Sequence, residues 1–192
     1  MDKIKTIGVI GSGTMGDGIA HVAGRGGFQV LLVDVQQEAL NRGLETISRN
    51  LDREIAKNKA SMSEKSEVIS RITATTDVRR LAESDFIVEA VVEDLEAKTK
   101  LLQSLDRIVR SDVILASNTS SISITKMASK TQKPDRVIGM HFMNPVPVMK
   151  LVEVVRGLAT SSDTCQTTKN LAESLGKTPV EVADFPGFVS NR

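Results

Sequence analysis

The chain has 192 residues, enough for one domain with a sizeable hydrophobic core. Its 25 Lys and Arg residues nearly balance 24 Asp and Glu residues, and a formal net charge of +1 gives no reason to expect a nucleic acid or membrane partner. One cysteine forms no disulfide framework and no zinc pair, and no apolar run approaches the roughly 18 residues that span a bilayer. We therefore predict a cytoplasmic protein that binds small molecules and no metal.

Short apolar runs, each suited to a buried strand, alternate along the chain with segments of helical spacing. Continuous Val, Ile and Leu runs of this kind are typical of a parallel sheet that helices cover on both faces. The sequence thus predicts an α/β fold with a doubly wound, mainly parallel sheet, in a single domain over residues 1–192. The expected strands are 6–10, 29–33, 72–75, 85–92, 113–116, 136–140 and 150–155.

The segment from residue 36 to residue 71 is far longer than one crossover between strands needs. Its apolar residues recur at the spacing of a long amphipathic helix, which a shorter helix follows. We expect these two helices to project from the sheet as an arm. The residues that set the spacing are Leu40, Leu44, Ile47, Leu51 and Ile55.

Three glycines follow the first expected strand in the order G-x-G-x-x-G, at the start of a helix. The first, Gly11, permits a tight turn; the second, Gly13, lets a pyrophosphate approach the backbone; the third, Gly16, lets helix and strand pack closely. The free amides of a helix N-terminus, here around Thr14 and Met15, attract phosphates. This pattern predicts a Rossmann-like dinucleotide site.

The second expected strand ends on Asp34, 18 residues after Gly16. A carboxylate at about this spacing binds the adenosine ribose hydroxyls, and it would repel the 2'-phosphate of NADP. We therefore predict NAD as the cofactor. The alternative is that Asp34 is a surface residue that caps the next helix.

Polar or glycine residues follow the ends of five expected strands. In an open α/β sheet, ligands bind beyond the carboxyl ends of the strands. We therefore expect these residues to meet in one crevice. They are Gly11, Asp34, Glu93, Asn118 with Ser120, and His141.

The sequence places His141 directly after an expected strand and Glu153 within the next apolar run. A neutral imidazole that a carboxylate orients can act as a base, and a buried carboxylate needs a partner. These two residues are a candidate proton-handling dyad. The other histidine, His21, shares a helix face with Asp17 and Arg25 at four-residue spacing, so we expect it on the solvated surface.

Five stretches carry a resemblance to the L-3-hydroxyacyl-CoA dehydrogenase family, and to its bacterial 3-hydroxybutyryl-CoA members above all. They are "GVIGSGTMGDGIA", "FIVEAVVED", "ILASNTSSISIT", "RVIGMHFMNPVPVMKLVEVV" and "PGFVSNR". The resemblance implies a reversible, NAD-dependent oxidation of an L-3-hydroxyacyl-CoA in fatty acid or butanoate metabolism. It implies that His141 is the base, that Glu153 holds it, and that Ser120 and Asn191 bond the 3-oxygen of the substrate.

The resemblance also implies that Glu93, Lys98, Asn118 and Asn144 line the nicotinamide end of the cofactor site. The arm is expected to help bind coenzyme A. Lys57 and Lys59 on the arm would suit a coenzyme A phosphate, although Asp52, Glu54 and Glu64 lie among them, and a solvated charged helix explains them equally well.

Family members carry a further all-helical domain after the "NR" motif, which closes the acyl pocket and provides most of the dimer contact. This chain ends at that motif, so we expect the second domain to be absent and Asn191 to be the penultimate residue. Two alternatives stay open. The chain is an NAD-binding module without turnover, or a dehydrogenase of the same fold that acts on a sugar acid.

Overall fold

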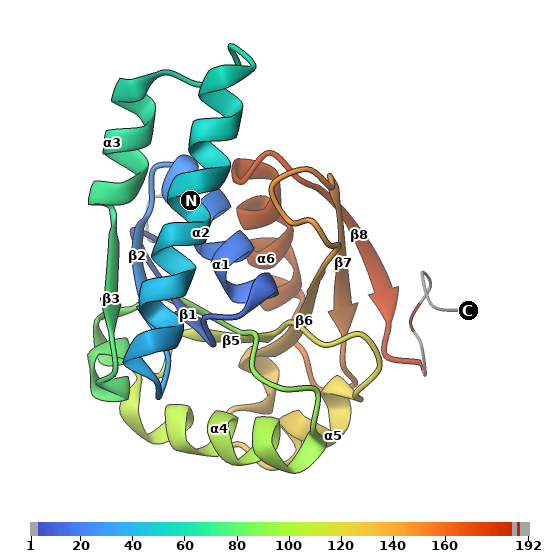
Figure 1. Cartoon of the computed structure of the whole chain (residues 1–192). Coiled ribbons are helices and arrows are strands. Elements are labelled where there is room, and N and C mark those ends of the chain that lie inside the picture. The colour runs from blue at the N-terminus through green and yellow to red at the C-terminus, as the bar shows by residue number, and fades with distance from the viewer. Residues whose placement is uncertain (1–3, 186–187, 189–192) are drawn as a thin grey trace.

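An eight-stranded sheet forms the centre of the protein, and helices cover both of its faces (Figure 1). The computed structural model describes residues 4–185 and residue 188. The strand order is β3-β2-β1-β4-β5-β6-β7-β8, and every neighbouring pair is parallel except β6 and β7. The strands are β1 (Thr6–Ile10), β2 (Gln29–Val33), β3 (Ile72–Thr75), β4 (Phe86–Glu89), β5 (Ile114–Ser117), β6 (Val137–Phe142), β7 (Leu151–Arg156) and β8 (Thr178–Ala183).

Side chains that alternate along the strands build one apolar core on each face of the sheet. On β1, Val9 belongs to the core that α1 and α2 cover, whereas Ile10 belongs to the core that α4 and α5 cover. This confirms the predicted doubly wound α/β fold. The helices are α1 (Thr14–Arg25), α2 (Gln37–Ala56), α3 (Met62–Ser70), α4 (Leu95–Ile108), α5 (Ile124–Ala128) and α6 (Ser162–Ser174), with 3₁₀ turns η1 (Val78–Glu83) and η2 (Pro134–Arg136). None of these helices is both long and apolar enough to cross a bilayer.

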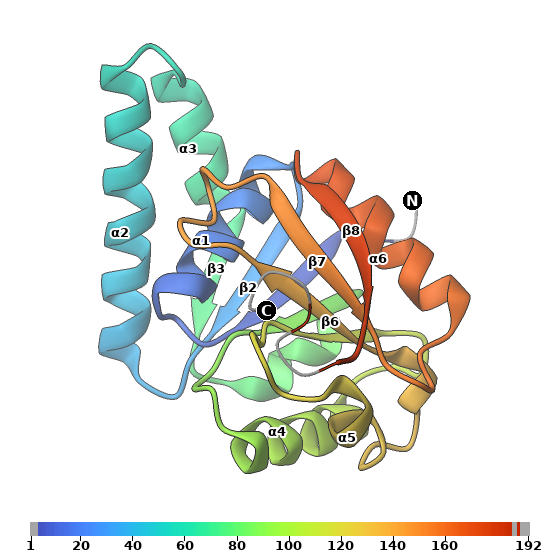
Figure 2. The same cartoon turned by 90° about the vertical axis from the view of Figure 1, so that its right-hand side faces the viewer.

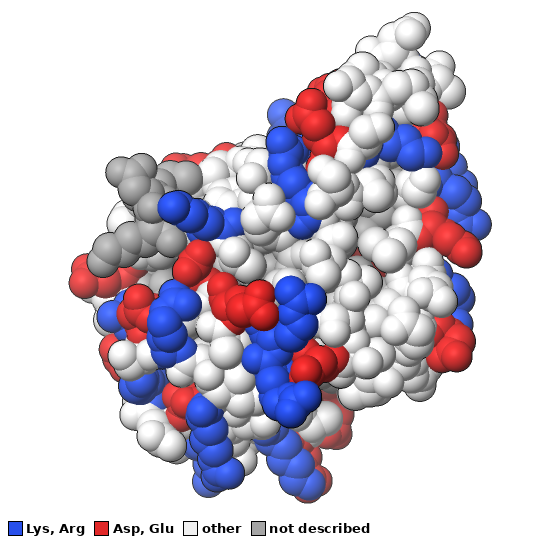
Figure 3. Space-filling view, turned by 90° about the vertical axis from the view of Figure 1, so that its left-hand side faces the viewer, with Lys and Arg blue, Asp and Glu red and all other residues white. Residues whose placement is uncertain are grey.

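The predicted arm consists of α2 and α3, which extend together beyond the sheet (Figure 2). Helix α3 starts with a capping box, in which Ser61 and Glu64 each accept a hydrogen bond from the other's backbone amide. An ion pair of 2.6 Å between Lys65 and Asp52 joins the two helices. Acidic and basic side chains are interspersed over the face of the molecule shown in Figure 3, the arm included.

Three expectations about local structure are wrong. Strand β8, "TPVEVA", was not predicted. It is an edge strand that pairs only with β7, and its Pro179 and mostly exposed side chains lack the apolar pattern of a buried strand. The fourth strand ends at Glu89 rather than at residue 92; the Ala90 amide donates the last bond of the ladder to the Ile10 carbonyl oxygen, at 2.7 Å. His141 lies inside β6 rather than after it.

His21 is buried, not solvated. Its exposed fraction is 1%, and neither ring nitrogen has a hydrogen-bond partner among the described residues. The ring lies at the wall of a cavity that Pro147 and Lys177 also line, because the loop before β7 and the turn before β8 cover this part of α1. Burial lowers the pKa of His21, and the neighbouring Arg25 and Lys177 oppose the pull of Glu54.

Candidate active site

Of the three glycines in the turn after β1, only the middle one, Gly13, has open space beside it for a ligand. Gly11 has φ 94°, and a Cβ there would lie 2.7 Å from the Ala90 carbonyl oxygen. A Cβ on Gly16 would lie 1.7 Å from the Gly11 carbonyl oxygen, so the turn requires glycine at both positions. A Cβ on Gly13 would meet nothing within 4 Å, and α1 begins at the next residue, Thr14. The turn therefore fits a pyrophosphate that approaches from the open side, toward the helix N-terminus.

Asp34 is tied to this turn. Its Oδ2 accepts a hydrogen bond from the Ser12 amide at 2.7 Å, and its Oδ1 accepts one from the Gln36 amide at 3.0 Å. Asp34 is half-buried at the carboxyl end of β2, two residues before Gln36, which is the N-cap of α2. Asp34 thus orders the entry to α2 while its carboxylate stays beside the glycine turn, as a ribose ligand must.

Sequence reasoning missed a buried contact under the same turn. The Ser12 hydroxyl lies 2.8 Å from Asp17 Oδ1 and 3.1 Å from the Ala39 carbonyl oxygen. Burial raises the pKa of Asp17, against the effect of the Ser12 hydrogen bond. Gly43 of α2 packs on this pair, so α2, α1 and the turn meet at one point. The sequence carried one signal for this contact, which is the charged residue Asp17 in the first turn of α1.

His141 and Glu153 face each other across the antiparallel pair β6 and β7. They are register partners, and His141 Nδ1 lies 2.8 Å from Glu153 Oε2. Directly opposite residues of an antiparallel pair point to the same face, so the strand register itself creates this contact. Both side chains are buried, and the ring of Phe188 lies 6.0 Å from the imidazole, centroid to centroid.

A cavity of about 350 Å³ lies at the carboxyl ends of β4, β5 and β6. Asn118 bridges two of these ends, because its Oδ1 accepts a hydrogen bond from the Phe142 amide at 2.9 Å. The cavity brings together many of the residues predicted for the active site. They are Met15, Glu93, Asn118, Ser120, His141 and Asn144.

Glu153, Asp34 and the residues of the glycine turn, described above, do not line this cavity, and neither do three more of the predicted site residues. Lys98 has no exposed surface at all. Lys57 and Lys59 lie in the turn between α2 and α3, at the far end of the arm from the loops after β4 and β5 (Figures 1 and 2). A fourth, Asn191, falls outside the described residues.

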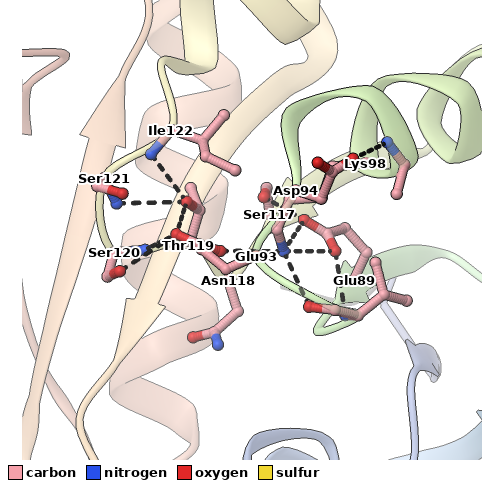
Figure 4. Close-up of polar contacts among 12 residues, drawn as sticks. Glu89, Glu93, Asp94, Lys98, Ser117, Asn118, Thr119, Ser120, Ser121 and Ile122 are labelled. Atoms are coloured by element: carbon pink, nitrogen blue, oxygen red, sulfur yellow. Dashed lines mark hydrogen bonds and ion pairs between the residues drawn. The ribbon is translucent and has the colours of Figure 1, made fainter.

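Lys98 belongs to a buried polar network that Figure 4 shows. Its Nζ lies 2.9 Å from each carboxylate oxygen of Glu89, and the Ser117 hydroxyl donates to Glu89 Oε1. Burial raises the pKa of Glu89, against the effects of Lys98 and Ser117. Glu89 is not among the predicted site residues, although a carboxylate inside the apolar run "FIVEAVV" needs a buried partner, as Glu153 does.

Glu93 connects this network to the loop after β5. One oxygen, Oε2, lies 3.6 Å from Lys98 Nζ. The other, Oε1, accepts hydrogen bonds from the Thr119 hydroxyl at 2.5 Å, the Ser120 amide at 2.9 Å and the Ser120 hydroxyl at 3.1 Å. Burial alone would raise the pKa of Glu93, but these hydrogen bonds and Lys98 outweigh it, and the pKa lies below its usual value.

A family model described as "3-hydroxyacyl-CoA dehydrogenase, NAD binding domain" matches residues 6–185. The chain belongs to this family. NAD is therefore the cofactor of this NAD-binding domain.

Similar proteins and solved structures carry the names of the same family. The chain is 52% identical over 190 residues to a probable 3-hydroxybutyryl-CoA dehydrogenase of Bacillus subtilis, and 44% identical over 192 residues to a 3-hydroxyadipyl-CoA dehydrogenase of Escherichia coli. The crystal structure of (S)-3-hydroxybutyryl-CoA dehydrogenase from Ralstonia eutropha superposes with a TM-score of 0.97 at 46% identity, over 98% of this chain and 67% of that one. The matches cover 99% and 100% of this chain, but only 66% of the Bacillus relative and 40% of the Escherichia relative.

Proposed function

We propose that this chain supplies the cofactor site and the catalytic base of a dehydrogenase that oxidises an L-3-hydroxyacyl-CoA, such as 3-hydroxybutyryl-CoA, to the 3-oxoacyl-CoA. The observation that carries the proposal is that His141, bonded to Glu153, lines a cavity together with Glu93, Ser120 and Met15 of the glycine-turn helix. The names of the relatives support the substrate class.

Bound NAD supplies the hydride acceptor for the hydrogen on C3. The protein handles the proton. With Nδ1–H donated to Glu153, the neutral His141 ring keeps Nε2 as an acceptor for the 3-hydroxyl proton of the substrate. Glu153 then stabilises the imidazolium that forms, and in the reverse direction His141 returns the proton to the 3-oxygen. A positioned base of this kind is worth roughly 10²–10⁴ in rate.

Ser120 is a candidate donor to the substrate's 3-oxygen. In the structure its hydroxyl donates to Glu93, so it would have to turn toward the substrate when the substrate binds. The bond from the Ser120 amide to Glu93 can stay in place during this turn and keep the loop fixed.

The test uses this chain and a version extended to the length of its relatives, each mixed with NADH and acetoacetyl-CoA while nicotinamide absorbance is followed. We expect NADH to bind to both and the extended chain to turn over faster, because this chain spans only 66% of the Bacillus relative, and a substrate oxygen misplaced by about 1 Å can cost on the order of a hundredfold. His141→Gln in the extended chain should abolish most turnover. His21→Leu, at the second histidine, is the control and should keep it.

Two results would contradict the proposal. NADH binding without turnover in the extended chain would favour an NAD-binding module. Near-normal turnover in the His141→Gln variant would show that another group is the base.

A further inference from the structure

We propose that Lys177, in the turn before β8, is a positioning residue. Its ammonium holds the loop between β6 and β7 by two backbone carbonyls, and this loop carries Asn144 at the wall of the active-site cavity. The inference rests on the proposed function, because we expect Asn144 to lie at the nicotinamide end of bound NAD. Its direct evidence is the pair of hydrogen bonds from Lys177 Nζ to the carbonyl oxygens of Val146 and Met149.

The first step is the environment of the Lys177 ammonium. Lys177 is only 8% exposed, although it lies in the short turn that connects α6 with β8. Burial lowers its pKa, and within the part of the chain that the structure describes no carboxylate opposes this change. Taking a lone ammonium out of water is costly unless hydrogen bonds compensate. The two loop carbonyls provide that compensation, so this contact ties the ammonium and the loop to each other.

The second step is the shape of the loop. The amides of Val148 and Met149 both donate to the Pro145 carbonyl oxygen, at 3.0 and 2.9 Å, so the chain makes a single helical turn here. The last carbonyl oxygens of such a turn point away from its own amides, and a lysine side chain can cap them. Lys177 Nζ does so at the Val146 carbonyl and, at 2.8 Å, at the Met149 carbonyl.

The third step links the turn to the active site. Met143 and Asn144 directly precede it, and both line the cavity that His141 also lines. Because Asn144 is exposed, packing does little to hold it, and its position follows that of the backbone. Val146 is buried against α1, where a Cβ on Gly18 would lie 2.7 Å from it. The loop is therefore held by α1 on one side and by Lys177 on the other.

The fourth step is the support of Lys177 itself. Gly176 ends α6 with φ 71°, a left-handed conformation that favours glycine, and the Lys177 amide donates to the Ala172 carbonyl oxygen at 3.0 Å. The Thr178 amide donates to the Lys150 carbonyl oxygen at 2.8 Å, which joins the start of β8 to the end of the loop. The side chain thus reaches the loop carbonyls from a turn that is fixed on both sides.

The test compares three variants. Lys177→Met keeps most of the apolar stem and removes the donors, and it strands no buried counter-charge. Lys177→Arg keeps a cation with several donors and should retain the contact. Lys150→Met is the matched control, because it removes the same charge from an exposed position next to the same loop.

Two readouts distinguish positioning from simple stabilisation. Amide hydrogen exchange reports the Val148 and Met149 amides, which close the turn, and calorimetry compares NADH with ADP-ribose, which lacks the nicotinamide. In Lys177→Met we expect the protection of both amides to fall about tenfold. NADH affinity should fall about tenfold while ADP-ribose affinity changes less than about twofold. Lys177→Arg and Lys150→Met should stay within about threefold of the unmodified chain in both readouts.

Unchanged protection of the two amides in a folded Lys177→Met variant would overturn the proposal, and so would equal losses for NADH and ADP-ribose. If Lys177→Met did not fold, Lys177→Arg would decide: a folded variant that keeps NADH affinity supports the two donors, and one that loses it overturns them. Failure of the unmodified chain to bind NADH would contradict the proposed function instead. The exchange of the Val148 and Met149 amides would then still decide whether Lys177 holds the loop.

Discussion

Gly43→Ala should destabilise the protein, although it replaces glycine by alanine inside a helix. Helix propensity alone predicts a gain of about 0.5–1 kcal/mol. In the structure, however, the added Cβ would lie 2.2 Å from the Ser12 hydroxyl and 2.4 Å from Asp17 Oδ1. Either α2 moves away from the glycine turn or the Ser12–Asp17 hydrogen bond breaks.

The two costs can be set against the gain. Overpacking a tight contact costs about 1–3 kcal/mol, and a buried hydrogen bond to a charged group is worth about 1.5–3 kcal/mol. The structure can relieve one of these costs only by accepting the other. A cost of about 1.5–3 kcal/mol less the gain of about 0.5–1 kcal/mol leaves an expected net loss of about 0.5–2.5 kcal/mol in the free energy of unfolding. NADH affinity should fall as well, since the Ser12 amide positions Asp34.

Denaturant unfolding of Gly43→Ala beside Asn41→Ala measures this loss. Asn41 is exposed on the same helix, two residues earlier. Alanine there gains helix propensity and loses only the exposed hydrogen bond from Gln37, so stability should change by no more than a few tenths of a kcal/mol. If Gly43→Ala proved as stable as the unmodified protein, α2 would not be packed on the turn in the way described.

Asp34→Ala should weaken NAD about ten- to a hundredfold and NADP less, because the lost bond is to a charged group; equal losses for both in titration calorimetry would show that Asp34 does not read the ribose. His21→Leu should flatten the pH dependence of stability. Burial lowers the pKa of His21 in the folded protein below its ordinary 6.5, so the unfolded chain binds the proton more readily, and stability falls as the pH drops below 6.5. The slope from this one group is at most about 1.4 kcal/mol per pH unit, and an unchanged slope in urea titrations across this window would exclude His21 as its source. In the extended chain, Glu153→Gln should lower turnover with acetoacetyl-CoA nearly as much as His141→Gln, because a misoriented imidazole is a poor base; near-normal turnover with a folded sheet would separate the two residues.

The sequence by itself determined the features that depend on local spacing. The glycine turn, the carboxylate 18 residues later and the order of apolar runs are each written within a few dozen residues. They were sufficient to predict the doubly wound fold and NAD as the cofactor, and the repeated Leu and Ile spacing was sufficient to predict the helical arm. Their physics is local, because backbone sterics and periodic burial act over short stretches of chain.

Only the tertiary structure decided which charged groups are buried and what each one contacts. His21 and Lys98 stand in patterns that suit solvated helix faces, yet both are buried. Glu89 of β4 contacts Lys98 of α4 and Ser117 of β5. Lys57 and Lys59 lie in the turn between α2 and α3 and do not line the cavity. The register of β6 and β7 sets His141 opposite Glu153, which spacing in the sequence left open. The physical reason is that burial and ion pairing depend on which elements pack together, and those neighbours lie far apart along the chain.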